Sequence, residues 1–189
     1  MSTSPRTPDD PLARDETVVP DGKDWTWVVE RRCPECGFDA AGVPRTALAP
    51  LLRKAAGDWP AIASAEWSRR RPAPAIWSPL EYAAHVRDAV DLARERLALS
   101  LAEDDPEYES WDQDAAAVAG RYGEQDPSAV ADQVGAALLS FAAAVDAVPE
   151  GSWGRTGRRT DGYRLTVDSL VRYFAHDVMH HLWDARPRA

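Results

Sequence analysis

Apolar side chains recur every three to four residues in four long segments, the spacing that keeps them on one face of an α-helix. We predict helices over residues 46–65, 78–101, 126–147 and 166–184. The second has the clearest start, because Ser78, Pro79 and Glu81 form a capping-box sequence with proline in the first turn. Pro60 should kink or break the first helix, since it lacks an interior N–H. The pattern predicts an all-α protein, a four-helix bundle.

The connections between these helices lack regular apolar spacing. We expect a short helix near residues 114–120 and a short hairpin around Trp153 and Tyr163. The bundle is then predicted to span residues 45–185, and it follows an irregular N-terminal extension.

The N-terminal extension divides into two parts by composition. Residues 1–23 are rich in Pro, Asp, Arg and Thr, which predicts a disordered tail. Within residues 24–44, Trp25–Val29 is β-prone and is expected to lie extended along the bundle. Cys33–Asp39 is typical of a tight turn, and we call it the CxxC knuckle.

Composition and charge exclude several classes of protein. No run of about 20 apolar residues is present, and the first residues lack the apolar region of a signal peptide, so we expect a cytoplasmic protein without a membrane span. The net charge is -9, with both signs interspersed and no basic stripe. Proteins that bind nucleic acid usually concentrate Lys and Arg on one face, so no nucleic-acid partner is expected.

The histidines suggest a metal site. His176 and His180 are four residues apart, so on a helix they share one face, whereas His181 lies about 140° around from His176 and is expected to pair with Asp177 at the surface. His85 falls on the second predicted helix. We predict that the bundle brings His85 to His176 and His180, giving three nitrogen ligands for a divalent metal. Three protein ligands leave open positions, as in catalytic sites.

Two carboxylates are candidates for orienting these imidazoles. Asp88 follows His85 by three residues, and Asp184 follows His180 by four. The alternative is that both are solvated surface charges. Zinc is the foremost candidate metal, with nickel, iron and manganese as alternatives.

The same residues carry a family resemblance. Trp77–Asp88 and Tyr173–His181 resemble the corresponding motifs of the DinB superfamily, which includes mycothiol-dependent maleylpyruvate isomerase and other low-molecular-mass thiol S-transferases. The resemblance implies a four-helix bundle in up-down-down-up order, often a homodimer. It also implies a divalent metal held by His85, His176 and His180, although some members have a carboxylate at the position of His176.

Two function classes follow. The first is a metal-dependent thiol S-transferase or isomerase, in which the metal lowers the pKa of a thiol co-substrate that attacks an electrophilic substrate. Lysine occurs only at Lys23 and Lys54 and asparagine is missing, which indicates a GC-rich genome and favours mycothiol as that thiol. No catalytic residue is assigned. The alternative is a non-enzymatic metal-binding protein acting in stress response or as an interaction module.

Two further features remain open at this point. Cys33 and Cys36 are free thiols in a stabilising turn, a redox pair or half of an intermolecular zinc site, or additional ligands that join the histidines at one metal. The connector before the last helix carries four arginines, which form either a rim for an anionic ligand or a solvated loop: Arg155, Arg158, Arg159 and Arg164.

Overall fold

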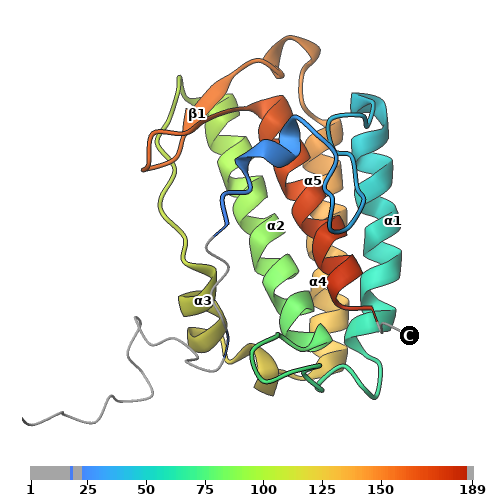
Figure 1. Cartoon of the computed structure of the whole chain (residues 1–189). Helices are drawn as coiled ribbons and strands as arrows, with labels where there is room; N and C mark the ends of the chain where they lie inside the picture. The colour runs from blue at the N-terminus through green and yellow to red at the C-terminus, as the bar shows by residue number, and fades with distance from the viewer. Residues whose placement is uncertain (1–17, 19–22, 187–189) are drawn as a thin grey trace, which may run out of the picture.

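Four long helices form the body of the protein (Figure 1). The structure, a computed structural model, describes residue 18 and residues 23–186. The long helices are α1 (Arg45–Ala63), α2 (Pro79–Ala102), α4 (Pro127–Asp146) and α5 (Val167–Asp184). Shorter elements are η1 (Thr26–Val29), α3 (Gln113–Ala119), η2 (Tyr122–Glu124), η3 (Glu150–Ser152), β1 (Thr156–Arg158) and β2 (Arg164–Thr166). The predicted all-α class and four-helix bundle are confirmed.

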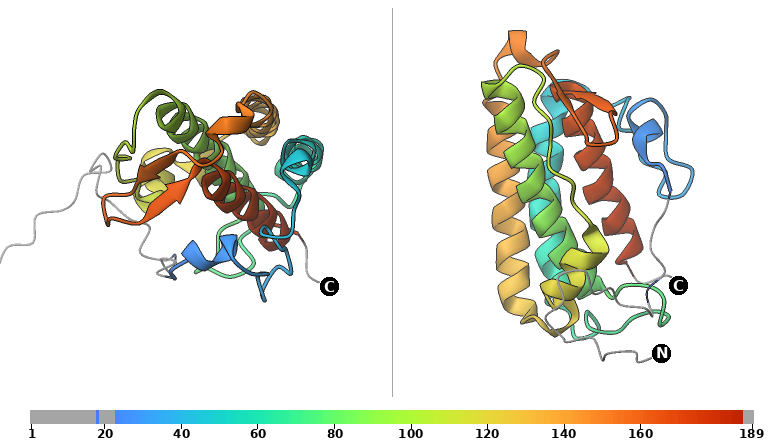
Figure 2. Two further views of the ribbon diagram at one scale, coloured as in Figure 1. Left: turned by 90° about the horizontal axis from the view of Figure 1, so that it is seen from above. Right: turned by 90° about the vertical axis from the view of Figure 1, so that its left-hand side faces the viewer.

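The helices run in the order down, up, up, down as Figure 1 is drawn. α1 and α2 each pack against both α4 and α5, so α1 and α2 lie on opposite corners of the bundle. The long crossover that contains α3 makes α2 and α4 parallel. Seen end-on in Figure 2, the N-terminal segment lies outside α5, away from the other long helices.

The predicted capping signals set the helix starts. Ser78 Oγ accepts from the amide of Glu81, and Glu81 Oε2 accepts from the amide of Ser78 at 2.7 Å, which completes the capping box. Asp126 caps α4 through the amide of Ala129 at 2.8 Å. Thr166 caps α5. These caps satisfy amides that have no partner inside their own helix.

The core is built from the apolar faces of the long helices. α4 contributes Val134, Leu138 and Phe141, all fully buried, between α1 and α2. Of the described helices, α4 alone is long and apolar enough to cross a membrane, and half of its most apolar stretch is buried. Burial of that kind is also what a core helix of a bundle shows.

Pro60 does not break α1 where the sequence predicted a kink or break. The helix continues through it to Ala63, and the amide of Ser64 donates to the carbonyl of Pro60 at 3.0 Å. The missing N–H of Pro60 frees the carbonyl of Ala56, which faces Gly135 of α4. A proline in the last turn removes only one hydrogen bond, so α1 continues past Pro60 and ends at Ala63.

The N-terminal extension also differs from expectation in one respect. Residues 26–29 form the 3₁₀ helix η1, not an extended segment. Asp24 Oδ1 accepts from the amide of Thr26 at 2.9 Å and starts the turn, while Val28 is buried. The CxxC knuckle does turn tightly, since the amide of Cys33 donates to Phe38 and that of Gly37 to Cys33. The predicted tail, residues 1–23, lies outside the described residues except for residues 18 and 23.

Candidate metal centres

The four histidines fall into two clusters, and α5 contributes to both. Because each helical residue turns about 100° from the one before, the pair at positions 176 and 180 and the pair at positions 177 and 181 occupy neighbouring faces of α5. One face looks toward the CxxC knuckle and the other toward α2. In each cluster the candidate ligand atoms all lie within 4.8 Å of one another.

The first, which we call the interhelical cluster, consists of His85, Asp177 and His181. His85 Nε2 lies 3.7 Å from Asp177 Oδ2, and His181 Nε2 lies 3.5 Å from Asp177 Oδ1. These separations are long for hydrogen bonds. All three candidate ligand atoms lie within 4.8 Å of one another, so small side-chain movements would bring them to bonding distance of one zinc ion.

Unpaired polar atoms support a metal at this position. His85 is 1% exposed, yet neither of its ring nitrogens has a hydrogen-bond partner among the described residues, and neither does Asp177 Oδ2. Trp77 and Trp111 cover the His85 ring, with ring centroids 5.3 Å and 5.5 Å away. A buried polar atom without a partner is costly, and a cation bound between the two side chains would satisfy His85 Nε2 and Asp177 Oδ2.

Asp184 orients the third member of this cluster. His181 Nδ1 and Asp184 Oδ2 are 3.1 Å apart, so the Nδ1–H donates to the carboxylate and Nε2 remains toward Asp177. An imidazole that binds a metal through one nitrogen usually donates the other N–H to a carboxylate in this way. The donor set of two imidazoles and one carboxylate fits a catalytic zinc site with three protein ligands.

Charge is balanced around this cluster. Burial by itself would raise the pKa of Asp177, but His181 and His85 hold it well below its usual value. Burial would lower the pKa of His181, but Asp177 and Asp184 outweigh that effect and raise it to about 9. Burial lowers the pKa of His85, with Asp177 opposing the shift. The cluster thus favours one positive charge between its carboxylates, which a proton or a metal ion can supply.

The second, the knuckle cluster, consists of Cys33, Cys36, His176 and His180. Cys33 Sγ lies 3.8 Å from His180 Nδ1, and Cys36 Sγ lies 3.8 Å from His176 Nε2. Burial, with repulsion from His180, lowers the pKa of His176 to about 4. Burial, together with Cys33, raises the pKa of the Cys36 thiol to about 11. The His176 imidazole and the Cys36 thiol are therefore neutral near pH 7 without a metal.

The predicted ligand set is divided between these clusters. The structure brings His176 and His180 together, as their spacing predicted, but it places His85 with Asp177 and His181 on the α2 side of α5. The predicted surface pair of Asp177 and His181 is instead a mostly buried ion pair, with 21% and 17% of the side chains exposed. The sequence signal for this second pair was present, because its spacing is also four residues.

The two candidate carboxylates have different roles. Asp184 contacts His181, and its Oδ2 also lies 3.5 Å from His180 Nε2. Asp88 accepts instead from the hydroxyl of Tyr122 and from Arg87 Nε at 2.7 Å. It does not hydrogen-bond His85, because both carboxylate oxygens face these other donors.

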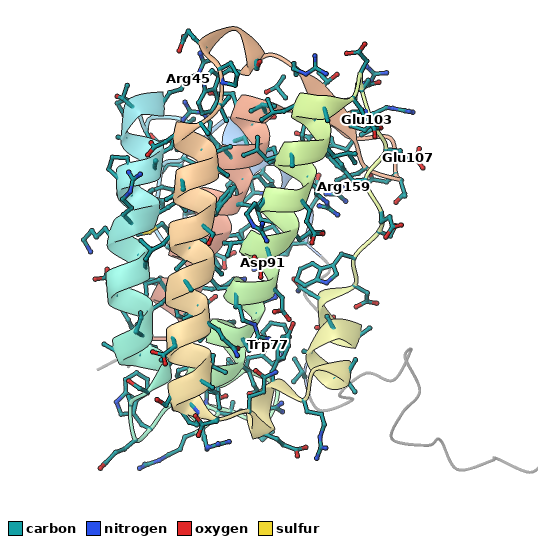
Figure 3. The ribbon with its side chains drawn as sticks, turned by 180° about the vertical axis from the view of Figure 1, so that it is seen from behind. Arg45, Trp77, Asp91, Glu103, Glu107 and Arg159 are labelled. Carbon is teal, nitrogen blue, oxygen red and sulfur yellow. The ribbon has the colours of Figure 1, made fainter. Side chains whose placement is uncertain are left out.

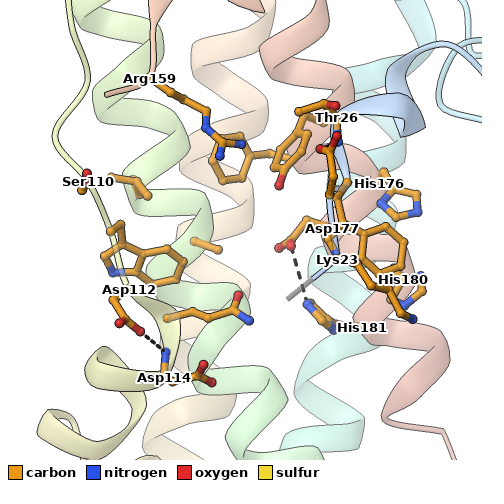
Figure 4. A pocket seen from close by; sticks show the side chains of 18 of the residues that line it. Lys23, Thr26, Ser110, Asp112, Asp114, Arg159, His176, Asp177, His180 and His181 are labelled. Carbon is orange, nitrogen blue, oxygen red and sulfur yellow. Dashed lines mark hydrogen bonds and ion pairs between the residues drawn. The ribbon is translucent and has the colours of Figure 1, made fainter. Parts of the chain in front are cut away.

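A cleft of about 1380 Å³ adjoins the interhelical cluster (Figure 4). Asp177 and His181 line it, and its walls include Trp77, Tyr82 and Trp111. Lys23, Trp25 and Thr26 of the N-terminal segment close another side. The cleft therefore presents aromatic surface beside the candidate ligands.

Of the four connector arginines, Arg159 lines the cleft together with Arg96 of α2. Arg155, Arg158 and Arg164 each pair with acidic residues of the segment after α2, Asp104, Asp105 or Glu107. Figure 3 shows Glu103 and Glu107 near the upper end of α2, with Arg159 below them. The predicted arginine rim is thus mainly a set of surface ion pairs.

Comparison with known proteins supports the fold. No curated protein matches the chain significantly. Among solved structures, YfiT from Bacillus subtilis, described as "a probable metal-dependent hydrolase with an unusual four-helix bundle topology", superposes with a TM-score of 0.67. The identity is 14%, and the match covers 86% of this chain and 96% of that one. The family model of the DinB superfamily matches residues 47–185, well over half of the chain. The chain therefore belongs to the DinB superfamily.

Proposed function

We propose that the chain is a metal-dependent enzyme that adds a small-molecule thiol of the mycothiol type to an electrophilic substrate, as an S-transferase or isomerase. The observation that carries the proposal is the interhelical cluster, in which buried ring nitrogens of His85 and an oxygen of Asp177 without hydrogen-bond partners lie beside the cleft. Three protein ligands leave positions free for a reactant.

Each residue of the cluster has a definite part in this proposal. A bound ion would displace the proton that His181 carries in the metal-free cluster, so His85 and His181 would bind as neutral imidazoles and Asp177 as a carboxylate. Asp184 holds the His181 ring in place. A divalent ion bound there would act as a Lewis acid and lower the pKa of a coordinated thiol, so that the thiol would be deprotonated at pH 7. The donor set favours zinc, with nickel, iron and manganese as alternatives.

The dimensions of the cleft favour a reaction of two molecules. Sites for a single small ligand usually occupy about 300–1000 Å³. The volume of about 1380 Å³ leaves space for a thiol co-substrate and a second reactant. Trp77 and Trp111 offer apolar contact surface, and Arg96 and Arg159 offer positive charge to an anionic group.

Hydrolysis is the second candidate. The same ligands would serve a reaction with water as the nucleophile. The description of YfiT as a probable metal-dependent hydrolase favours this alternative. A third candidate is metal binding without catalysis.

One experiment separates these candidates. The zinc-loaded chain is incubated with an electrophile such as maleylpyruvate or a chloro-nitroaromatic compound, and in parallel with an activated ester, each with and without mycothiol. Thiol-dependent consumption that the His85→Ala variant lacks supports the proposal. Ester cleavage that does not need the thiol, again lost in the variant, supports hydrolysis. A rate equal to that of the variant in every arm, with metal bound, contradicts both enzymatic candidates.

A further inference from the structure

We propose that the knuckle cluster binds a second metal ion, a structural zinc held by Cys33, Cys36, His176 and His180, separate from the ion of the interhelical cluster. The site attaches the N-terminal segment to the outer face of α5. It uses none of the three residues that the proposed catalytic site uses.

The distances suit a tetrahedral ion. With bonds of about 2.3 Å to sulfur and 2.0–2.1 Å to nitrogen, a tetrahedral zinc separates sulfur from nitrogen by about 3.6 Å. The observed separations, from Cys33 Sγ to His180 Nδ1 and from Cys36 Sγ to His176 Nε2, are both 3.8 Å. All four donor atoms lie within 4.8 Å of one another. Small movements therefore suffice to bring them to one ion.

The local backbone presents the two sulfur atoms together. In the knuckle the amide of Cys33 donates to the carbonyl of Phe38 at 2.8 Å, and the amide of Gly37 donates to the carbonyl of Cys33 at 2.9 Å. Gly37 has a φ of +75°, a conformation that side chains rarely allow. The order of ligands, two cysteines separated by two residues and two histidines separated by three, is the spacing of structural zinc sites.

Most of the site is shielded from solvent, and only His176 and His180 reach the lining of the cleft, while Cys36 is half-buried. Cys33 is fully buried, and His176 and His180 are 4% and 6% exposed. The ring of Trp25 lies over both histidines, with centroids 5.5 Å from His176 and 4.8 Å from His180. Four protein ligands leave no open position, which distinguishes a structural site from a catalytic one.

The proposed ion would fix one wall of the cleft. The cleft is lined by Glu35 of the knuckle and by three residues of the segment before it, Lys23, Trp25 and Thr26. The short helix η1, which precedes the knuckle, also contacts α5. Zinc would replace the protons of the two thiols, which are released to solvent. It would thereby link this segment to α5, which lies more than 130 residues later in the sequence.

The test uses cobalt in place of zinc. Metal-free full-length protein is titrated with Co²⁺, and thiolate-to-cobalt charge-transfer absorption is recorded in the near ultraviolet. We expect two Co²⁺ ions to bind per chain, and the absorption to reach its maximum when one of them is bound to the two thiolates. Cys36→Ser should abolish it, while His85→Ala should retain it and lose the other ion. Glu30→Gln, which changes an exposed carboxylate before the knuckle, should behave as wild type.

Thiol reactivity gives an independent measurement. In the zinc-loaded chain, both cysteines should resist a thiol reagent until a chelator removes the metal. Wild-type protein that takes up cobalt without thiolate absorption, or thiols that react equally before and after chelation, would overturn the proposal. So would a purified chain in which the two cysteines form a disulfide and no ion is bound. Loss of the thiolate-bound ion in His85→Ala would instead show that both clusters hold one shared metal, which also contradicts it.

Discussion

The imidazole rings of His180 and His181 stand nearly perpendicular, at 84°, with their centroids 5.7 Å apart. These neighbours in sequence therefore serve different clusters, one facing the knuckle and the other facing α2. Asp184 lies between them, 3.1 Å from His181 Nδ1 and 3.5 Å from His180 Nε2. One carboxylate is thus positioned to support both candidate metal centres.

Removal of this carboxylate should weaken metal binding. In Asp184→Ala, His181 loses the acceptor that holds its ring, so metal affinity at the interhelical cluster should fall about 10–100-fold. Competition with a chelator of known affinity measures the change in the Cys36→Ser background, which isolates this cluster. Asp91→Asn, at an exposed ion pair with Arg94, is the control and should keep wild-type affinity. Equal affinity in both variants would show that Asp184 does not orient a ligand.

The architecture was largely predictable because local signals coincide with helix boundaries. Ser78, Asp126 and Thr166 cap the helices at the predicted positions, since each side chain satisfies a first-turn amide. The segment 26–29 was not predictable from its β-prone residues. Asp24 and contacts with α5 decide its conformation, and such tertiary contacts override propensity.

The candidate sites were predictable only in part. Spacing placed His176 beside His180, but it could not decide which face of α5 meets α2. That choice depends on how the helices rotate when they pack, and it brings His85 to Asp177 and His181. The CxxC motif carried a further signal, because two cysteines need two more ligands to complete a zinc site, and among the described residues the structure places His176 and His180 beside them.

Ionised Glu81 should stabilise the metal-free chain at neutral pH, and this contribution should be lost in acid. Burial would raise the pKa of Glu81, but hydrogen bonds from Arg71 and Ser78 outweigh it and lower the pKa below the usual value. A lowered folded pKa adds stability above the unfolded pKa of about 4.3, and that stability disappears as the pH falls through the folded value. Glu81→Gln should lower the free energy of unfolding by about 1.5–3 kcal/mol at pH 7.

Urea unfolding with chelator at pH 7 and at pH 3 measures this contribution. The difference between Glu81→Gln and wild type should shrink at the lower pH. Glu124→Gln changes an exposed carboxylate on η2 and serves as the control, with little effect at either pH. A difference that is the same at both pH values would exclude ionised Glu81 as its source.

Gly157 should not tolerate a side chain. A Cβ at this position of β1 would overlap the ring and hydroxyl of Tyr108, which is 2% exposed and hydrogen-bonded to Ser100 at 2.6 Å. Gly157→Ala should therefore lower the free energy of unfolding by about 1–3 kcal/mol. Gly151→Ala is the matched control, because a Cβ there meets nothing within 4 Å. Equal melting temperatures of the two variants would contradict this explanation.

Proteolysis should report whether the knuckle is attached to α5. Arg31 and Arg32 are exposed trypsin sites just before the buried Cys33. Cleavage requires the segment to leave the bundle locally, and a bound ion at the knuckle cluster opposes that opening. Cys36→Ser should therefore be cut at these sites much faster than zinc-loaded wild type, and a chelator should accelerate cleavage of wild type but not of the variant. His85→Ala should show the slow wild-type rate, because it leaves the four knuckle ligands intact. If the chelator accelerates cleavage of Cys36→Ser as much as that of wild type, the protecting ion is not bound at the knuckle.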